Sequence, residues 1–223
     1  MTKNSICFFF NKKESTAPDK TRNLILDEAR KLFSEKGFEG ASIRDICCGA
    51  SVNVSAIKYH FGGKEGLYRE CFKIYGEGRL NSASKILTKA TSLDEIKLRL
   101  KLFCEDFIKE GLDNMHTTRM IWREIENENP LIVDIFQETF LKVYSTLVEM
   151  IDDAKNKKFI RNDLESAIMA SVFFHSLTTS IRLDHVGEKY FKKSLRDPLY
   201  AELYINNIIS IFFDGIKNPG AII

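Results

Sequence analysis

The chain has 223 residues, of which 44% are hydrophobic, and its formal net charge is +2. A hydrophobic content of this size can form a folded core, so a disordered chain is excluded. Prolines and glycines are few, and no run of about 18 apolar residues occurs, so we expect an all-α protein without a membrane span. The first 75 residues carry a charge of +4 and the remainder −2, which favours binding of a polyanion at the amino-terminal end.

The first predicted elements are an arm and a helix. Residues 1–18 are expected to form a flexible arm, and the helix is expected to begin near Asp19 or Thr21, because both side chains can cap a helix. The apolar residues of this helix recur at a spacing that places them on one face. Gly37 is a helix-stop signal, so the helix is expected to end at Lys36.

Residues 42–68 have the pattern of two short helices joined by a tight turn and followed by paired glycines. Ser42, with an acidic residue three positions later, resembles a capping box and predicts a helix over residues 43–49. A turn over residues 49–53 leads into a second helix over residues 54–61, which is too short to be stable alone. Its neighbours must hold it, and its outer face is then free to enter the major groove of duplex DNA. The pattern is typical of a helix-turn-helix.

The rest of the chain shows six further helical patterns, and prolines mark the starts of two of them. The expected helices are residues 64–89, 93–112, 117–128, 130–155, 163–185 and 198–216. The last two are apolar on nearly every face, and such a helix must be buried on more than one side. The second burying surface is most simply another copy of the chain, so we expect a homodimer formed through the last two long helices.

Cysteine usage and the absence of catalytic motifs limit the chemistry that we expect. The five cysteines fit neither a disulfide framework nor a zinc finger, and we interpret them as small buried hydrophobes in a reducing compartment, the cytoplasm. Histidines and carboxylates lack the spacing of metal ligands, so no metal and no cofactor are expected. No nucleophile elbow, phosphate-binding glycine loop or close carboxylate pair occurs, so we do not expect an enzyme.

One set of residues between Thr21 and Phe72 forms a motif that is specific to a family. Its members are Arg22, Ile25, Ala29, Leu32, Phe33, Glu35, Gly37, Phe38, Ser42, Ile43, Arg44, Asp45, Ile46, Ala50, Ile57, Tyr59, His60, Phe61, Lys64, Glu65 and Leu67. With these residues the chain resembles the TetR-type transcriptional regulators, the TetR/AcrR family. The variant over residues 53–68 looks like the CecR-like branch, and Trp122-Arg123-Glu124 with Asn129-Pro130 is similar to the body of that branch.

The resemblance implies a homodimer with about nine helices per subunit. It implies an amino-terminal three-helix bundle with the helix-turn-helix over residues 19–63, and a carboxy-terminal helical ligand-binding and dimerisation domain over residues 64–223. The partners that it implies are a double-stranded DNA operator and a small-molecule effector. Residues that fall at phosphate-contacting positions of the family are Ser42, Tyr59, His60 and Lys64, and those at base-contacting positions are Arg44, Ser55, Ala56 and Lys58.

The chemistry of these side chains agrees with the implied roles, although simpler explanations exist. A lysine or arginine can donate to guanine, and alanine can touch a thymine methyl group. Tyr59, His60 and Lys64 are donors suited to phosphate oxygens. Alternatively, Tyr59 could be a core aromatic, His60 could cap the short helix, and Lys58 could be a solvated charge. Lys58 replaces the tyrosine that is common in the family, and Val54 offers no hydrogen bond to a base.

A cluster of aromatic and polar residues in the second part of the chain could form the effector pocket. Its candidates are Phe103, Phe107, Trp122, Arg123, Phe174 and His175. Such a wall, mostly apolar with a few polar groups, suits an amphipathic ligand. The aromatic residues could equally be core, Arg123 with Glu124 could be a surface pair, and His175 could be a core histidine.

We therefore predict a sequence-specific DNA-binding regulator, a repressor that a small-molecule ligand releases from a palindromic operator. Release requires that the ligand binds one state of the protein more tightly than the other. The alternative keeps the DNA-binding head and makes the body a docking surface for a protein partner. A body without an enclosed apolar cavity would favour that alternative.

Overall fold

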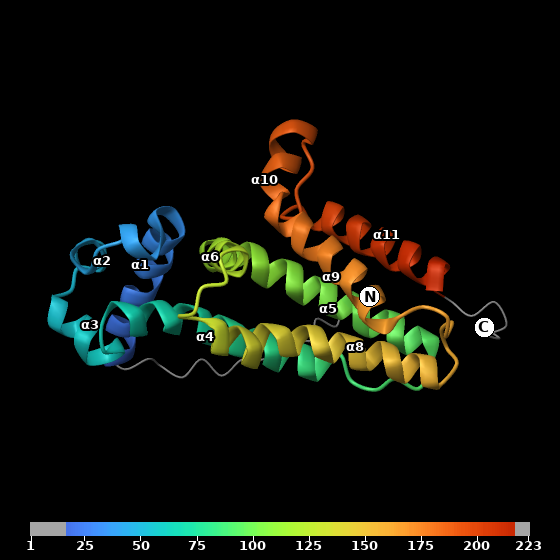
Figure 1. Cartoon of the computed structure of the whole chain (residues 1–223). Coiled ribbons are helices and arrows are strands. Elements are labelled where there is room, and N and C mark those ends of the chain that lie inside the picture. Colours follow the sequence, from blue (N-terminus) through green and yellow to red (C-terminus); the bar gives the residue numbers. More distant parts are fainter. Residues whose placement is uncertain (1–16, 217–223) are drawn as a thin grey trace, which may run out of the picture.

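The computed structural model describes residues 17–216 and confirms the all-α prediction. An amino-terminal head, α1–α3 with the start of α4, lies at one end of an elongated body (Figure 1). The helices are α1 (Ala17–Gly40), α2 (Ile43–Ala50), α3 (Val54–Phe61), α4 (Lys64–Ile86), α5 (Leu93–Asp113), α6 (Met115–Glu126), α7 (Val133–Ile135), η1 (Phe136–Phe140), α8 (Leu141–Asn156), α9 (Ser166–Arg182), α10 (Asp184–Val186), η2 (Gly187–Phe191) and α11 (Pro198–Ile216). Over the described range, no helix is long and apolar enough to cross a membrane.

The first helix differs from its prediction at both ends. It begins at Ala17, so the last two residues of the expected arm are helical, while residues 1–16 lie outside the described part of the chain. At the other end the regular helical backbone stops at Gly37, whose φ of 77° is accessible to glycine at little cost, and a further turn follows to Gly40. The stop signal at Gly37 was therefore identified correctly.

The two helices of the helix-turn-helix lie where the sequence predicts them. The Ser42 hydroxyl accepts a hydrogen bond from the Asp45 backbone N–H (3.0 Å) and caps α2. Ser51 ends α2 in the left-handed conformation, with a φ of 54°. The bounds of α3 are those expected.

The core of the head includes side chains from outside its first three helices. Ile25, Phe33, Ile46 and Ile57 are fully buried there. The same hydrophobic cluster includes residues of later elements. They are Tyr68 and Phe72 of α4, Met120 and Ile121 of α6, Ile132 just before α7 and Ile135 at the end of α7. The head is thus built partly on the helices that follow it, and α6 in particular packs against α1.

A second cluster fills the body and is formed mainly by α5, α8, α9 and α11 together with the carboxy-terminal half of α4. The α4 helix therefore runs from the core of the head into the core of the body (Figure 1).

The predicted helix over residues 130–155 is wrong at its start. Residues 130–132 form a turn, in which the Asn129 side chain accepts a hydrogen bond from the Leu131 N–H (3.0 Å), and the helix starts only at Val133. Its first turns include the π-helix η1, which faces Gly76 of α4 closely enough that a Cβ atom there would lie 2.3 Å from the Thr139 hydroxyl oxygen. A π-helical turn changes the direction of the side chains that follow it.

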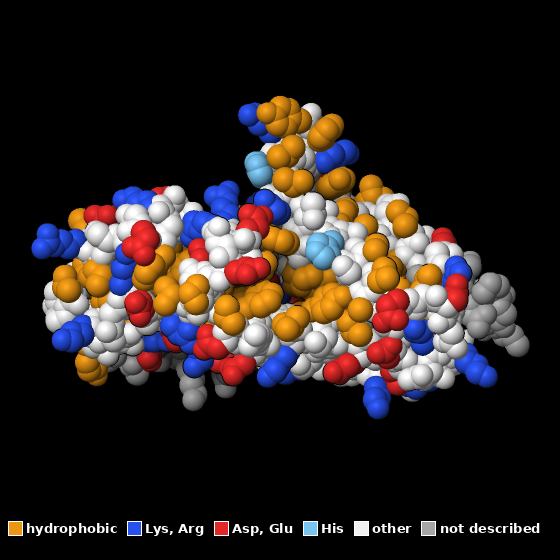
Figure 2. Space-filling view, in the orientation of Figure 1, with side chains coloured by type: hydrophobic (Ala, Val, Ile, Leu, Met, Phe, Trp, Pro, Cys, Tyr) orange, Lys and Arg blue, Asp and Glu red, His pale blue; other side chains and the backbone are white. Residues whose placement is uncertain are grey.

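The last two long helices keep one apolar face uncovered in the single subunit. Ile168 and Val172 of α9 and Leu199, Leu203 and Ile211 of α11 are exposed. Figure 2 shows hydrophobic side chains on the surface above α9 and α11. The prediction that both helices are buried on more than one side is not met within one subunit, so a further surface is needed to cover them.

Candidate DNA interface and effector cavity

The short helix α3 is fixed at both ends and on one face. The Asn53 side chain accepts a hydrogen bond from the Ala56 N–H (3.0 Å) and another from the Ser55 hydroxyl, while the Gly62 N–H donates to the Lys58 carbonyl oxygen (3.0 Å). On the inner face Ile57 is fully buried. These contacts supply the stability that an isolated eight-residue helix lacks.

The first turn of α4 packs tightly against the carboxy-terminal end of α3. A Cβ atom on Gly66 would lie 1.8 Å from the Phe61 carbonyl oxygen, so only glycine fits at this position. Between the two helices Gly63 has a φ of 138°, which residues with a side chain rarely adopt. The paired glycines therefore set the angle between α3 and α4 rather than only ending a helix.

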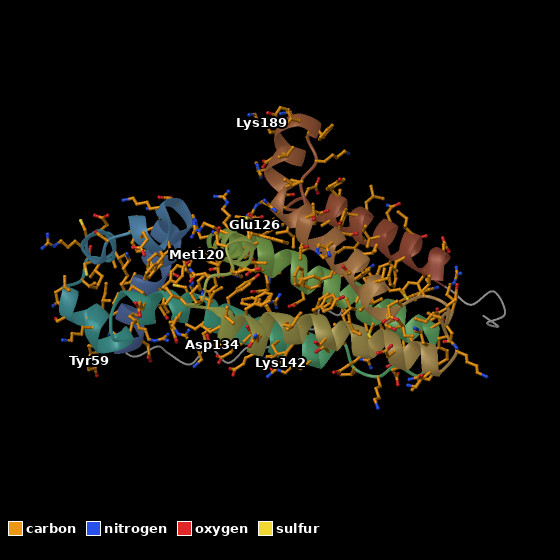
Figure 3. The ribbon with its side chains drawn as sticks, viewed as in Figure 1. Tyr59, Met120, Glu126, Asp134, Lys142 and Lys189 are labelled. Atoms are coloured by element: carbon orange, nitrogen blue, oxygen red, sulfur yellow. The ribbon has the colours of Figure 1, made fainter. Side chains whose placement is uncertain are left out.

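The outer face of α3 is open to solvent. The Tyr59 side chain is 83% exposed and points away from the rest of the molecule (Figure 3), so it is not a core aromatic. Lys58 and Val54 are also exposed, and the half-buried His60 ring lies at an edge-to-face angle to the Tyr59 ring at 4.9 Å. A cation, a phenol and an imidazole are thus presented together on one side of the head.

The other predicted DNA contacts are less free to change partner. The Ser55 hydroxyl is part of the Asn53 cap, and Ala56 is half-buried against the head core. The Lys64 ammonium lies over the Phe38 ring (4.5 Å from its centroid) and near the Glu39 carbonyl oxygen (3.4 Å). On α2, Arg44 is exposed. Ser42 is exposed too, although its hydroxyl oxygen already caps the helix.

Arg123 was predicted to lie in the effector pocket or to form a surface pair with Glu124. In the structure it is not among the residues that line the cavity of the body, and its partners include backbone atoms of α1. Its guanidinium donates to the backbone carbonyl oxygens of Phe33 (2.8 Å) and Ser34 (3.3 Å) in α1, and to the Glu124 carboxylate (3.0 Å). Asn129 donates to the other oxygen of that carboxylate (2.5 Å). Arg123 therefore ties α6 to the carboxy-terminal part of α1.

Ionisation at this junction is shaped by burial and by close partners. Burial tends to raise the pKa of Glu124, but contacts with Tyr68, Asn129 and Arg123 outweigh it and hold the pKa below its ordinary value of 4.5. The Tyr68 hydroxyl is buried without a hydrogen bond of good geometry, and burial together with the nearby Glu124 carboxylate raises its pKa far above the usual range. Glu124 is thus ionised and Tyr68 is neutral near pH 7.

A cavity of about 260 Å³ lies in the body between α4, α5, α6, α9 and the segment of η1 and α8. Its wall is almost entirely apolar and aromatic. The lining residues are Tyr75, Arg79, Phe107, Gly111, Thr118, Ile121, Trp122, Ile125, Phe136, Phe140, Leu141, Val143, Tyr144, Phe174, His175, Thr178 and Ile181. Clefts with this lining are the usual binding sites of small, mostly apolar molecules.

Four of the six predicted pocket residues line this cavity, namely Phe107, Trp122, Phe174 and His175. Phe103 does not, because it is buried behind Phe107 with the two ring centroids 5.4 Å apart. The lining residues of α4 and of the π-helical turn were not predicted from the sequence. Arg79 stands in a segment of mixed polar and apolar residues that gives no signal of a cavity, and its partner Asp106 on α5 is distant in the sequence.

The cavity wall includes one arginine and one histidine among its polar residues. Arg79 is only 7% exposed, and its guanidinium donates to the Asp106 carboxylate (2.7 Å), which leaves the pair neutral. The His175 Nδ1 atom lies 2.8 Å from the Ser171 carbonyl oxygen, which can only accept. The proton of the neutral imidazole is therefore on Nδ1, and Nε2 is an acceptor. The exposed His175 is not a core histidine.

Metal ligands are not grouped in the described part of the chain, where no set of three His, Cys, Asp or Glu side chains is placed to hold an ion. Three of the described cysteines, Cys47, Cys71 and Cys104, are buried, and Cys48 is exposed. Burial raises the pKa of the Cys71 thiol to about 12, so this thiol is a poor ligand and a poor nucleophile.

Comparison with known proteins points to one family. The model of the "Bacterial regulatory proteins, tetR family" matches residues 25–71. The "Probable HTH-type transcriptional regulator YttP" of Bacillus subtilis (strain 168) is 25% identical over 199 residues, which cover 84% of this chain and 90% of that protein. The biofilm operon icaADBC HTH-type negative transcriptional regulator IcaR of Staphylococcus epidermidis is 34% identical over 58 residues, 24% of this chain and 31% of IcaR.

Solved structures share the fold at low sequence identity. The ketosteroid transcriptional regulator KstR2 of Mycobacterium tuberculosis aligns with a TM-score of 0.69 at 18% identity, covering 88% of this chain and 95% of that chain. The TetR family transcriptional regulator PfmR of Thermus thermophilus aligns with a TM-score of 0.65 at 22% identity, covering 83% and 97%. All four of these proteins carry the name of a transcriptional regulator. The amino-terminal segment is thus similar to the TetR family of bacterial regulatory proteins, most of the chain is similar to a probable transcriptional regulator, and the fold is that of solved TetR-family regulators.

Proposed function

We propose that the protein binds a palindromic operator as a homodimer, with the α3 helix of each subunit in one of two successive major grooves. The observation that carries this proposal is the outer face of α3, where Lys58 and the 83% exposed Tyr59 project from a helix that is capped at both ends. Two such helices fit a duplex when they are about 34 Å, or a multiple of it, apart.

The roles of individual side chains follow from their exposure. Lys58 and Arg44 are exposed donors suited to base edges, with Ser55 and Ala56 as weaker candidates because they serve the cap and the core. Tyr59, His60, Ser42 and Lys64 contact phosphates in this proposal. Lys64 would leave its contact with the Glu39 carbonyl oxygen to do so, or share it.

The dimer forms through the exposed apolar face of α9 and α11. A surface of this kind on a single subunit is costly in water unless a partner covers it. Because each subunit presents the same face, a two-fold symmetric contact covers both faces at once. Ile168 and Val172 contribute to this contact from α9, and Leu199, Leu203 and Ile211 from α11.

The body binds a small effector in the cavity of about 260 Å³. Since the Arg79–Asp106 pair is neutral and the wall is apolar, the cavity favours an uncharged, largely apolar molecule. A hydroxyl or N–H group on that molecule could donate to Nε2 of His175. The cavity is open to solvent at exposed lining residues such as His175 and Ile125, and its concave apolar wall supports a small ligand rather than a protein partner as the signal that the body receives.

The helices α4 and α6 carry the signal from the cavity to the head. Thr118 and Trp122 of α6 line the cavity, while Arg123 of the same helix holds the backbone of α1. A ligand that moves α6 or α4 therefore changes the position of the head. Weakening operator binding 100-fold requires about 2.7 kcal/mol of difference between the ligand's affinities for the two states.

Repression is the proposed sign of regulation, and IcaR, which is described as a negative regulator, supports it for the matched head segment. The assignment to the CecR-like branch is also a proposal, supported by the residues from Asn53 to Tyr68. A regulator that binds the operators of its own cell works in the cytoplasm, as the cysteine usage suggests.

The test begins with selection of bound sequences from random duplexes at a stated salt concentration, repeated with candidate apolar effectors. A palindrome is expected, and an effector is expected to weaken its binding. On that palindrome, Lys58→Ala should cost about 1–3 kcal/mol, and Tyr59→Phe should cost less and equally on all sequences. Val133→Ala, an exposed change outside the head surface, is the control. Unchanged affinity in both head variants would show that α3 is not the reading helix.

A further inference from the structure

A folded arm projects from the body and has no role in the functions proposed above. It comprises residues 184–196, that is α10, η2 and the returning loop, and it rises beyond all other helices (Figure 1). At its tip Tyr190 is 66% exposed and Phe191 is 71% exposed. Hydrophobic side chains at the tip are flanked by basic ones (Figure 2).

The arm has a defined structure rather than that of a loose loop. Asp184 at its base is buried, and its carboxylate accepts hydrogen bonds from the Ser194 hydroxyl (2.9 Å) and the Leu195 N–H (2.6 Å). The Lys193 N–H donates to the Gly187 carbonyl oxygen (3.2 Å), and Arg196 donates to the Leu112 carbonyl oxygen (2.7 Å). Tyr190 and Phe191 are thus exposed to solvent on a segment whose structure is fixed by hydrogen bonds. Exposed aromatic side chains on an ordered segment are typical of a contact surface.

The position of the arm relates it to the proposed dimer. It continues directly from α9, whose apolar face we assign to the dimer contact. The end of α9 is joined to α6 by the Arg182–Glu126 ion pair (3.3 Å) and by Arg182 lying over the Trp122 ring. The base of the arm therefore lies beside the carboxy-terminal end of α6 (Figure 3, where Lys189 and Glu126 are labelled).

Symmetry decides which part of the second subunit the arm meets. Both heads must face the same duplex, so the two-fold axis points toward the DNA. Rotation about that axis keeps every residue at its own height above the DNA. The arm of one subunit thus reaches the second subunit at the height of that subunit's α6 end. Residues 125–128 are exposed there, among them Ile125 and the carboxylates Glu126 and Glu128.

We propose that the arm of each subunit packs on the carboxy-terminal end of α6 in the other subunit, with Tyr190 and Phe191 against Ile125 and with Lys189, Lys192 and Lys193 facing the carboxylates of Glu126 and Glu128. The proposal rests on the proposed dimer. Opposite charges on the two surfaces favour this contact over other faces. Because α6 lines the effector cavity and holds the head, the arm connects the state of one subunit to that of the other.

The first experiment measures the dimer dissociation constant of the full chain by analytical ultracentrifugation. Tyr190→Ser with Phe191→Ser should raise it about tenfold or more, since aromatic residues dominate interface energies. Leu24→Ser with Val133→Ser, which changes two exposed apolar side chains elsewhere, is the control and should have no effect. Val172→Glu separately tests the α9 face.

The second experiment identifies the contact. Dimers of isotope-labelled and unlabelled chains are treated with a carbodiimide, which joins lysine amines to adjacent carboxylates. Mass spectrometry should find links between arm lysines of one isotope and Glu126 or Glu128 of the other. Charge exchange adds an independent test: Glu128→Lys, which leaves the Arg182–Glu126 ion pair intact, should weaken the dimer, and adding Lys192→Glu should restore it.

The outcomes separate the two proposals. If Val172→Glu breaks the dimer while the arm variants leave it unchanged and all links lie within one subunit, the dimer stands and the arm proposal is overturned. If Val172→Glu has no effect, the proposed dimer face itself is wrong. Links from the arm to carboxylates other than Glu126 and Glu128 of the second subunit, without charge-exchange rescue, would overturn the assigned contact.

Discussion

The head and the body differ in how tightly their helices pack. In the head, short helices are fixed by caps, by glycines at close contacts and by fully buried side chains, and the outer face of α3 remains free. In the body, long helices with extensive apolar faces line a cavity of about 260 Å³ and leave the α9–α11 face exposed. Tight packing of the head fixes the position of the outer face of α3. The body has a cavity and an exposed apolar face on α9 and α11, which are available to other molecules.

This difference makes α6 the informative element, because it belongs to both regions. Met120 lies in the head core, Trp122 lines the cavity, and Arg123 holds the end of α1. A tightly packed region moves as a unit when one of its helices is displaced, whereas side chains around a cavity have room to move. A ligand that moves α6 on its cavity side is therefore expected to displace the head as a unit rather than to deform it.

The largest effect is expected from Gly66→Ala, which tests whether the head is as tightly packed as described. The new Cβ atom would lie 1.8 Å from the Phe61 carbonyl oxygen, and this backbone atom can move only if α3 moves relative to α4. The variant should lose about 4 kcal/mol or more of unfolding free energy, and operator binding with it. Urea unfolding, followed by the fluorescence of the single tryptophan, measures the loss.

Gly78→Ala is the matched control on the same helix. No atom lies within 4 Å of its new Cβ atom, so alanine should stabilise α4 by about 0.5–1 kcal/mol through its higher helix propensity. If the two substitutions changed stability equally, the close contact between α3 and α4 would not be a constraint.

The next largest effect is expected at the junction of the two regions. Arg123→Leu leaves the buried Glu124 carboxylate without its cation and removes two hydrogen bonds to the backbone of α1. The unfolding free energy should fall by about 3 kcal/mol, and operator affinity should fall as the head loosens.

The double variant Arg123→Leu with Glu124→Leu removes the uncompensated charge as well. It should be more stable than Arg123→Leu alone, because the desolvation cost of the carboxylate is gone. A single variant as stable as the wild type would contradict the assignment of this pair as the tie between α1 and α6.

The sequence predicted the head better than the body for a physical reason. The signals in the head are local: Ser42 and Asn53 cap helices within three residues, and Gly62 ends α3. Because these interactions depend on neighbouring residues alone, the predicted bounds of α3 agree with the structure, and those of α2 differ by one residue at its end. The sequence left open whether Tyr59 is exposed or a core aromatic; in the structure Ile57 occupies the inner face of α3 and Tyr59 is exposed.

The site in the body depends on contacts between distant segments, which the periodicity of one helix does not contain. Phe103 and Phe107 lie one turn apart on α5, yet only Phe107 reaches the cavity. Arg123 was assigned to the pocket as a polar group of a mostly apolar wall, but it lies next to Trp122 on α6, and consecutive residues of a helix point in different directions. The π-helical turn next to Gly76 was not predicted, because it depends on contact with α4.

The smallest expected effect concerns pH and tests whether Glu124 is ionised in the folded protein. Its folded pKa lies below the ordinary value of 4.5, so ionised Glu124 contributes stability above that pH. This contribution is lost as the pH falls from 4.5 through the folded pKa. Unfolding free energies of the wild type and of Glu124→Gln, measured by urea from pH 7 to pH 3.5, should therefore differ most near pH 7 and converge below pH 4.5. Carboxylates such as Asp134, whose pKa is held at about 2 mainly by its hydrogen bond with Arg69, titrate alike in both proteins and cancel in the difference. A difference that stayed constant with pH would mean that Glu124 has the same affinity for protons in the folded and unfolded chains, and the tie between head and body would then depend on the Arg123 hydrogen bonds to α1 alone.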